Sequence, residues 1–136
     1  LTSDHGFDLR NANHQLIDCI SEIKKLGIRV SLFMDPVIEQ ITLAKEIGAD
    51  RIEFYTGPYA HATDYKEALK PFQHAAEHAL SLGLGINAGH DLNLDNLSTF
   101  AQLPGLLEVS IGHAITVDAL QYGLQETVQR YLQLLR

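Results

Sequence analysis

Hydrophobic positions along the chain follow two alternating spacings, one typical of strands and one typical of helices. Four short apolar runs have the length and β-branched content of strands: 28–34, 51–55, 84–88 and 107–111. Between them, apolar residues recur every three or four positions, and these helical stretches end at glycine or proline. The expected helices are 11–26, 36–47, a segment ending at Leu82, 94–102 and 114–135. This regular alternation predicts a parallel sheet with helices packed on it.

Several local features are expected within this pattern. Residues 1–8 and 56–59 read as loops, and Asp35 is expected to cap a helix with Pro36 at its first position. Pro71 should divide or kink the segment that ends at Leu82. The last helix is expected to run unbroken, with one apolar face made of Ile115, Leu120, Leu124, Val128, Leu132 and Leu135.

Four strand–helix units amount to half of an eightfold barrel, whose usual length is about 250 residues. The predicted fold class is therefore α/β, of the (βα)8 TIM-barrel type, with this chain supplying about four βα units. An isolated half-barrel would leave two sheet edges unpaired. Either the other half is missing here, or a second copy covers the edges, or the sheet is open and doubly wound.

Composition narrows the class of protein. The 136 residues are 46% hydrophobic and 20% charged, which is ordinary for one soluble globular domain. The net charge of −7 argues against a nucleic-acid surface, and no apolar run approaches the roughly 18 residues of a membrane helix. The single Cys19 excludes an internal disulfide and fits a cytoplasmic protein. Cys19 lies on the apolar face of the first helix, where we expect a core residue.

Residues able to do chemistry follow the ends of the expected strands, where the active sites of barrels lie. They are Asp35; Glu53, Thr56 and Gly57; Asn87, Gly89 and His90; Gly112 and His113. Glu53 alternates with Ile52 and Phe54, so it should point into the barrel if those two face the helices. The alternative is a solvated carboxylate on an open sheet.

Two of these strand ends carry the same pair, Gly89-His90 and Gly112-His113. A histidine can move protons near neutral pH, and a glycine lets the backbone approach a ligand. The unpaired N–H groups at the start of the following helix can hold an anion. The two pairs together predict a shared site for a phosphorylated substrate, although a lone histidine more often fills a loop.

His74 and His78 are four residues apart and so share a helix face, a spacing found in metal sites. No cysteine or further carboxylate is placed to complete such a site. We therefore expect solvated histidines and predict no metal site.

Four motifs resemble the C-terminal half of pyridoxine 5′-phosphate synthase. They are residues 27–35, 52–60, 86–90 and 111–114, and the resemblance extends over essentially all 136 residues. It implies that residues 1–136 are the C-terminal half of a single TIM-barrel domain, in a homo-oligomer that is usually an octamer built from dimers. The implied partners are phosphorylated small molecules, with no nucleic acid and no membrane.

The resemblance also implies a reaction. It condenses 1-deoxy-D-xylulose 5-phosphate with 3-amino-2-oxopropyl phosphate to pyridoxine 5′-phosphate, phosphate and water, without a metal or organic cofactor. By resemblance, His90 is the proton donor, Glu53 stabilises the transition state and Asp91 contributes to the aminoketone phosphate site. Gly112 and His113 would bind the sugar phosphate. Thr56 and Gly57 complete the predicted substrate-binding residues.

Two departures from the family pattern matter. Position 91 is aspartate here, where the family often has glycine, and a carboxylate beside a phosphate is repulsive unless it points away. The family's other acid–base residues lie in its N-terminal half, so this polypeptide alone is expected to be inactive.

Two other functions stay open at this point. One is a non-catalytic phosphate-binding half-barrel that dimerises. The other is a different barrel enzyme, such as an aldolase or isomerase. The lysines lie in expected helices or loops, which argues against a Schiff-base aldolase.

Overall fold

The computed structural model describes residues 3–12 and 14–136, so residues 1–2 of the expected first loop lie outside the described part. Its first elements are a 3-10 helix η1 (Leu9–Asn11), α1 (His14–Lys25), β1 (Ser31–Met34), α2 (Ile38–Glu46), β2 (Arg51–Tyr55) and α3 (Gly57–Ala60). They are followed by α4 (Tyr65–Ser81), β3 (Gly85–Gly89), α5 (Leu97–Phe100), β4 (Leu106–Ser110), α6 (His113–Tyr122) and α7 (Leu124–Leu134).

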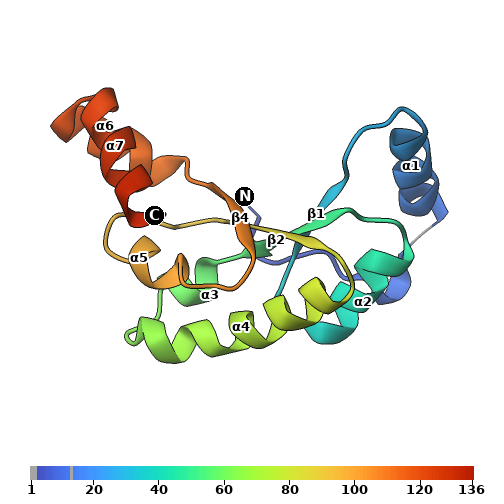
Figure 1. The fold of residues 1–136 in the computed structure, drawn as a ribbon. Coiled ribbons are helices and arrows are strands. Elements are labelled where there is room, and N and C mark those ends of the chain that lie inside the picture. The colour runs from blue at the N-terminus through green and yellow to red at the C-terminus, as the bar shows by residue number, and fades with distance from the viewer. Residues whose placement is uncertain (1–2, 13) are drawn as a thin grey trace.

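The four strands form one parallel sheet in chain order, β1-β2-β3-β4. Helices α2 and α4 lie along one face of this sheet, and no described helix crosses the other face (Figure 1). A doubly wound sheet would reverse its strand order and carry helices on both faces. Strands in chain order with helices on one side are instead half of a (βα)8 barrel, and the predicted fold class is confirmed.

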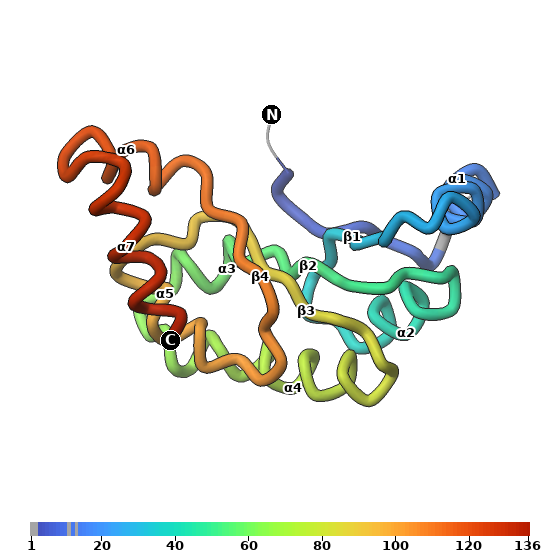
Figure 2. The backbone as a smooth tube through the Cα atoms, turned by 45° about the horizontal axis from the view of Figure 1, so that its top comes forward, coloured from blue at the N-terminus to red at the C-terminus, as the bar shows by residue number. Residues whose placement is uncertain are grey.

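Figure 2 shows the same sheet from another side, with α1 beyond β1 at one end and the α6–α7 pair beyond β4 at the other. The core lies between the sheet and α2 and α4. Strand residues Ile52, Phe54 and Ile86 are fully buried there, because apolar side chains at every second position face the helices. Small residues of α4, such as Ala75 and Ala76, are also fully buried and let the helix approach the sheet closely.

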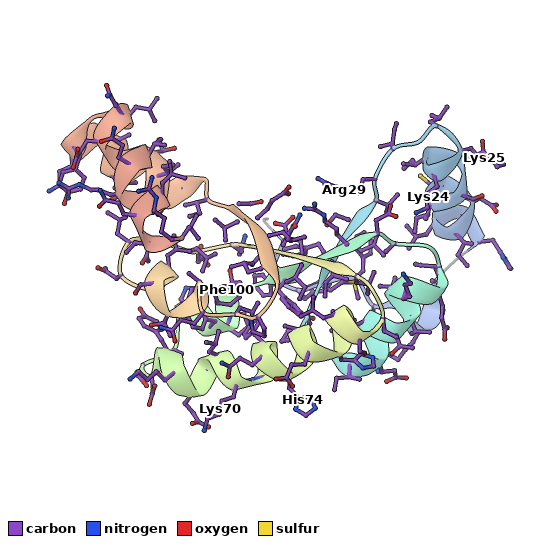
Figure 3. The ribbon with its side chains drawn as sticks, in the orientation of Figure 1. Lys24, Lys25, Arg29, Lys70, His74 and Phe100 are labelled. Atoms are coloured by element: carbon purple, nitrogen blue, oxygen red, sulfur yellow. The ribbon has the colours of Figure 1, made fainter. Side chains whose placement is uncertain are left out.

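Aromatic rings fill the wider part of this core, below β2 and β3. Tyr59 packs edge-on against Phe100, with ring centroids 4.9 Å apart, and Phe72 packs edge-on against both Phe54 and Phe100. Figure 3 labels Phe100 in this layer. The rings join α3, α4 and α5 to the sheet, so the segments that follow β2 and β3 rest on a packed base.

The opposite face of the sheet is polar. The Arg51 guanidinium lies 2.9 Å from Glu108 Oε1 and donates to Asn87 Oδ1 at 3.0 Å. The Asn87 amide in turn donates to Glu108 Oε2 at 3.1 Å, and Arg29 lies 3.5 Å from the same glutamate. This four-residue network, Arg29–Arg51–Asn87–Glu108, ties together β2, β3, β4 and the segment before β1.

The prediction of one unbroken helix over 114–135 is wrong, because this segment forms the two helices α6 and α7. Gly123 has φ 81° and ψ 149°, which ends α6 and begins α7. The expected apolar face is not buried: Leu120 is 87% exposed and Leu124 66% exposed. The side chains that α7 buries are Thr127 and Tyr131, and the Tyr131 hydroxyl donates to Asp118 Oδ2 at 2.6 Å.

Other helix ends also differ from expectation. Helix α2 begins at Ile38 with Val37 at its N-cap and no side-chain cap, because the Asp35 carbonyl accepts a bond from the Val37 N–H instead. Residues 57–60 form the short helix α3 where a loop was expected. Of the two arrangements expected at Pro71, the division into two helices is excluded, because α4 runs through this residue as one helix. The helix predicted over 94–102 is only the four residues of α5.

Cys19 is exposed, which contradicts the expected core position. Helix α1 lies at the end of the sheet, where Ile20 is its one buried residue and Leu16 and Ile23 pack partly buried against the core. Among the described helices, none is long and apolar enough to span a membrane.

Candidate active site

A cavity of about 1190 Å³ opens beside the carboxyl ends of the strands. Its walls include Glu53 of β2, His90 and Asp91 after β3, and Gly112 and His113 at the start of α6. Of the seven residues predicted to be catalytic or substrate-binding, these five line one cavity, and Thr56 and Gly57 do not. This gathering follows from the parallel sheet, because all four strands end at the same edge.

Glu53 reaches this cavity from the middle of β2. Its neighbours Ile52 and Phe54 are fully buried against the helices, so the alternation of strand side chains turns Glu53 to the polar face. Within the described residues its carboxylate has no hydrogen bond or ion pair, because Arg51, two residues earlier on the same face, is held by Glu108 and Asn87. Glu53 is therefore available to a bound substrate.

Gly89 provides the space in which the Glu53 carboxylate lies. A Cβ at position 89 would stand 2.4 Å from Glu53 Oε1 and 3.0 Å from Ser110 Cβ. Any side chain there must displace the carboxylate, because atoms cannot approach so closely.

We expect Gly89→Ala to lower kcat of the full-length protein by about 10- to 30-fold, because it would displace the Glu53 carboxylate from the position it needs to act on a bound substrate. Unfolding should be easier by about 1 to 3 kcal/mol because Ser110 must also move. Steady-state kinetics in a double-mutant cycle with Glu53→Gln checks the cause. An undiminished effect of Gly89→Ala in the Glu53→Gln background would show that it does not act through Glu53.

The backbone after β3 turns sharply at the two residues that face the cavity. His90 has φ 95° and Asp91 has φ 57°, a left-handed conformation that is rare for residues other than glycine. Hydrogen bonds hold the turn: the buried Thr56 hydroxyl lies 2.8 Å from the Gly89 carbonyl and also contacts the His90 carbonyl. The position of His90 is thus fixed through its backbone.

The His90 ring lies beside Tyr55 and Phe33, with centroids 5.1 Å and 6.4 Å away. Neither ring nitrogen has a hydrogen-bond partner among the described residues. Aromatic packing therefore orients the imidazole and leaves both nitrogens free to exchange a proton with a ligand.

Asn96 anchors the loop between His90 and α5. This fully buried side chain donates to the Asp91 carbonyl at 3.1 Å and accepts from the Asn93 N–H at 2.9 Å. The Asn96 carbonyl accepts from the Tyr59 hydroxyl at 2.6 Å. Burial raises the pKa of Tyr59 to about 12, so this phenol stays protonated and remains a donor.

Asn96→Ala should lower the free energy of unfolding by about 1 to 3 kcal/mol, because it removes a fully buried amide and leaves the Asp91 carbonyl and the Asn93 N–H without these hydrogen bonds. The freed Asp91 carbonyl should also loosen the left-handed turn and raise KM. Thermal unfolding and steady-state kinetics of the full-length protein measure the two effects. Asp95→Ala, at an exposed position of the same loop that does not line the cavity, is the control and should change KM less.

Gly112 and His113 bring backbone donors to the same cavity. Gly112 is the N-cap of α6, and nothing lies within 4 Å of where its Cβ would be. The N–H groups of the first turn have no partner inside the helix and carry the positive end of its dipole. This end of α6 can accept an anion.

Thr56 and Gly57 do not line the cavity. Thr56 is fully buried and its hydroxyl is used on the β3 turn, as described above. Gly57 packs below Tyr55, and a Cβ there would lie 2.3 Å from the Tyr55 hydroxyl oxygen. The structure gives both residues a supporting position, and a direct contact with substrate stays a prediction for them.

His61 lines the cavity although its sequence context gave it no role. It follows α3 directly, with Nδ1 2.8 Å from the Gly57 carbonyl and Nε2 3.9 Å from Asp91 Oδ2. The one signal in the sequence is its place just after the Thr-Gly-Pro-Tyr-Ala motif. Its distance from Asp91 depends on the fold and could not be read from the chain.

The histidine pair on α4 does not form a metal site in the described chain. His78 Nε2 lies 2.8 Å from the Thr42 hydroxyl of α2, and His74 points away from the sheet on the outer side of α4 (Figure 3). No group of three or more metal-binding side chains occurs among residues 3–12 and 14–136.

Comparison with known proteins adds a family to this geometry. The family model described as "Pyridoxal phosphate biosynthesis protein PdxJ" matches residues 1–136. Pyridoxine 5′-phosphate synthase of Xanthomonas axonopodis pv. citri is 53% identical over 140 residues, which is 100% of this chain and 55% of that protein. The synthase of Flavobacterium johnsoniae is 50% identical over 100% of this chain and 59% of its own length. The resemblance predicted from the sequence motifs is thus confirmed.

The chain spans just over half the length of these curated relatives. One solved structure, "Crystal structure of Amycolatopsis orientalis BexX/CysO complex", superimposes with a TM-score of 0.55 over 88% of this chain and 48% of that one. Its sequence is only 13% identical, so it supports the fold alone.

Proposed function

The chain belongs to the PdxJ family of pyridoxal phosphate biosynthesis proteins, and we propose that the full-length protein is a pyridoxine 5′-phosphate synthase. It condenses 1-deoxy-D-xylulose 5-phosphate with 3-amino-2-oxopropyl phosphate and releases phosphate and water. The names of the relatives support the product, and the cavity geometry supports phosphorylated substrates.

The observation that carries this proposal is the meeting of Glu53, His90 and the start of α6 in one cavity. Ring closure by condensation needs proton transfers to and from oxygen, and His90 is placed to donate a proton through a free ring nitrogen. Glu53, an unpaired carboxylate, would stabilise the positive charge that develops on nitrogen as the amine adds to a carbonyl.

Phosphate would be held by backbone groups. The first-turn N–H groups of α6, at Gly112 and His113, are proposed to bind the phosphate of the sugar substrate. The N–H of Asp91, which lines the cavity in the left-handed turn, is proposed to contribute to the aminoketone phosphate site, with Thr56 and Gly57 supporting the turn.

We further propose that residues 1–136 are the C-terminal half of one barrel domain in a cytoplasmic homo-oligomer. The polar face of the sheet and its edges support this, because the second half of a barrel would cover both. This polypeptide by itself would then lack residues that the reaction needs and would be inactive.

The test is an assay of the full-length protein with the two substrates, with pyridoxine 5′-phosphate measured by liquid chromatography and mass spectrometry. Formation of this product at the rate of phosphate release supports the proposal. Phosphate binding without turnover would favour the non-catalytic half-barrel instead. No lysine lines the cavity in the described chain, which argues against a Schiff-base aldolase.

A further inference from the structure

The proposed phosphate-binding cavity has an unusual charge balance. No lysine or arginine lines it within the described chain. Of the cations labelled in Figure 3, Lys24 and Lys25 lie on α1 and Lys70 on α4, while Arg29 is paired with Glu108. The ionisable groups that do line the cavity are Glu53, Asp91, His61, His90 and His113. Two carboxylates disfavour an anionic ligand, and among the described side chains that line the cavity only the histidines can carry a positive charge, in addition to the partial charge at the start of α6.

His61 is the cavity histidine that lies beside a carboxylate. The Gly57 carbonyl oxygen can only accept a hydrogen bond, so the nearby Nδ1 carries a proton. Nε2 then faces Asp91 Oδ2 at 3.9 Å. A neutral ring would turn a bare lone pair toward a carboxylate, whereas an imidazolium turns an N–H toward it. The attraction is a contact between charges, because 3.9 Å is too long for a direct hydrogen bond.

Buried side chains hold the backbone beside both members of the pair. Asp91 is fixed through its carbonyl by Asn96, and Asn96 is bonded to Tyr59 of α3. His61 follows α3 directly. The His61 and Asp91 side chains are 75% and 45% exposed, so solvent screens the pair and its effect is moderate.

We propose that His61 is a specificity-determining residue for anionic substrates. As an imidazolium paired with Asp91, it offsets that carboxylate and supplies positive charge at the mouth of the cavity. The chemical class it favours is a phosphate monoester. This inference rests on the proposed function, which places a phosphate close to Asp91.

The experiment measures binding of inorganic phosphate to the full-length protein by calorimetry. His61→Gln should weaken binding by about threefold to tenfold at about pH 6, and this ratio should shrink by about pH 8, where a free imidazole is mostly neutral. Asp91→Asn should tighten binding by about threefold, and high salt should reduce both effects. His74→Gln, on the outer face of α4, is the matched control.

An effect of charge should weaken phosphate binding in His61→Gln and tighten it in Asp91→Asn. A loss of structure would instead weaken binding in both variants. Equal affinity of the wild type and His61→Gln at both pH values would overturn the inference, and so would weaker binding by Asp91→Asn or no phosphate binding at all. A protein that binds phosphate in this His61-dependent way but forms no pyridoxine 5′-phosphate would contradict the proposed function alone. An active synthase with His61-independent binding would contradict the inference alone.

Discussion

Asparagine in place of His90 should lower turnover of the full-length protein by about 10²- to 10⁴-fold, the usual contribution of a positioned acid–base group. Asparagine is the informative replacement because it tolerates the left-handed backbone that His90 adopts at φ 95°. The turn should therefore survive, together with the bond from Thr56 to the His90 carbonyl. The side chain would no longer exchange protons near neutral pH.

The measurement is kcat and KM of purified full-length variants, with circular dichroism to verify folding. His74→Asn is the control, since His74 is exposed on α4 outside the cavity and should leave kcat unchanged. A His90→Asn enzyme with wild-type kcat would sink the proton-donor role.

Glu53→Gln should lower kcat by about 10²- to 10³-fold while leaving the melting temperature unchanged or slightly raised. The carboxylate has no partner among the described residues, so removing its charge breaks no ion pair and leaves only the interaction with the reacting atoms to be lost. Glutamine also keeps the volume above Gly89. Steady-state kinetics and thermal unfolding of the same preparation give both quantities.

Glu108→Gln is the matched control, because Glu108 lies at the same level of the sheet as Glu53 but is paired with Arg51. That variant should lose at most about 1 kcal/mol of stability, since the Glu108 side chain is half exposed, and little activity. If both variants lost stability and neither lost kcat, Glu53 would be a structural residue.

The sheet and most of the cavity could be predicted from local sequence pattern. The alternation Ile52-Glu53-Phe54 alone turns Glu53 away from the helices, and parallel strands then bring it to the same edge as His90 and Gly112. These predictions depend on spacing along a single strand or at its end, which the sequence displays directly.

The rest depends on contacts between distant segments. His61 enters the cavity because residues 57–60 form a short helix that Tyr59 pins to Asn96, a bond across 37 residues that no local pattern reveals. The helical period continues through Gly123, so the break there is set by one positive φ. Asp35 is a residue type that often caps helices, but its carbonyl accepts a hydrogen bond from the Val37 N–H, and α2 begins only at Ile38.

The chain-order sheet has a consequence for how the polypeptide folds. Within the described chain, each strand pairs with the strand made just before or just after it, as Arg51 of β2 does with Gly85 of β3. Each parallel pairing needs a crossover that contains a helix, and the entropy cost of closing it rises only slowly with its length. During synthesis, β1, β2 and β3 can therefore pair as soon as Gly89 has left the ribosome, without waiting for β4. The turn that presents His90 would then be built on a sheet that has already formed.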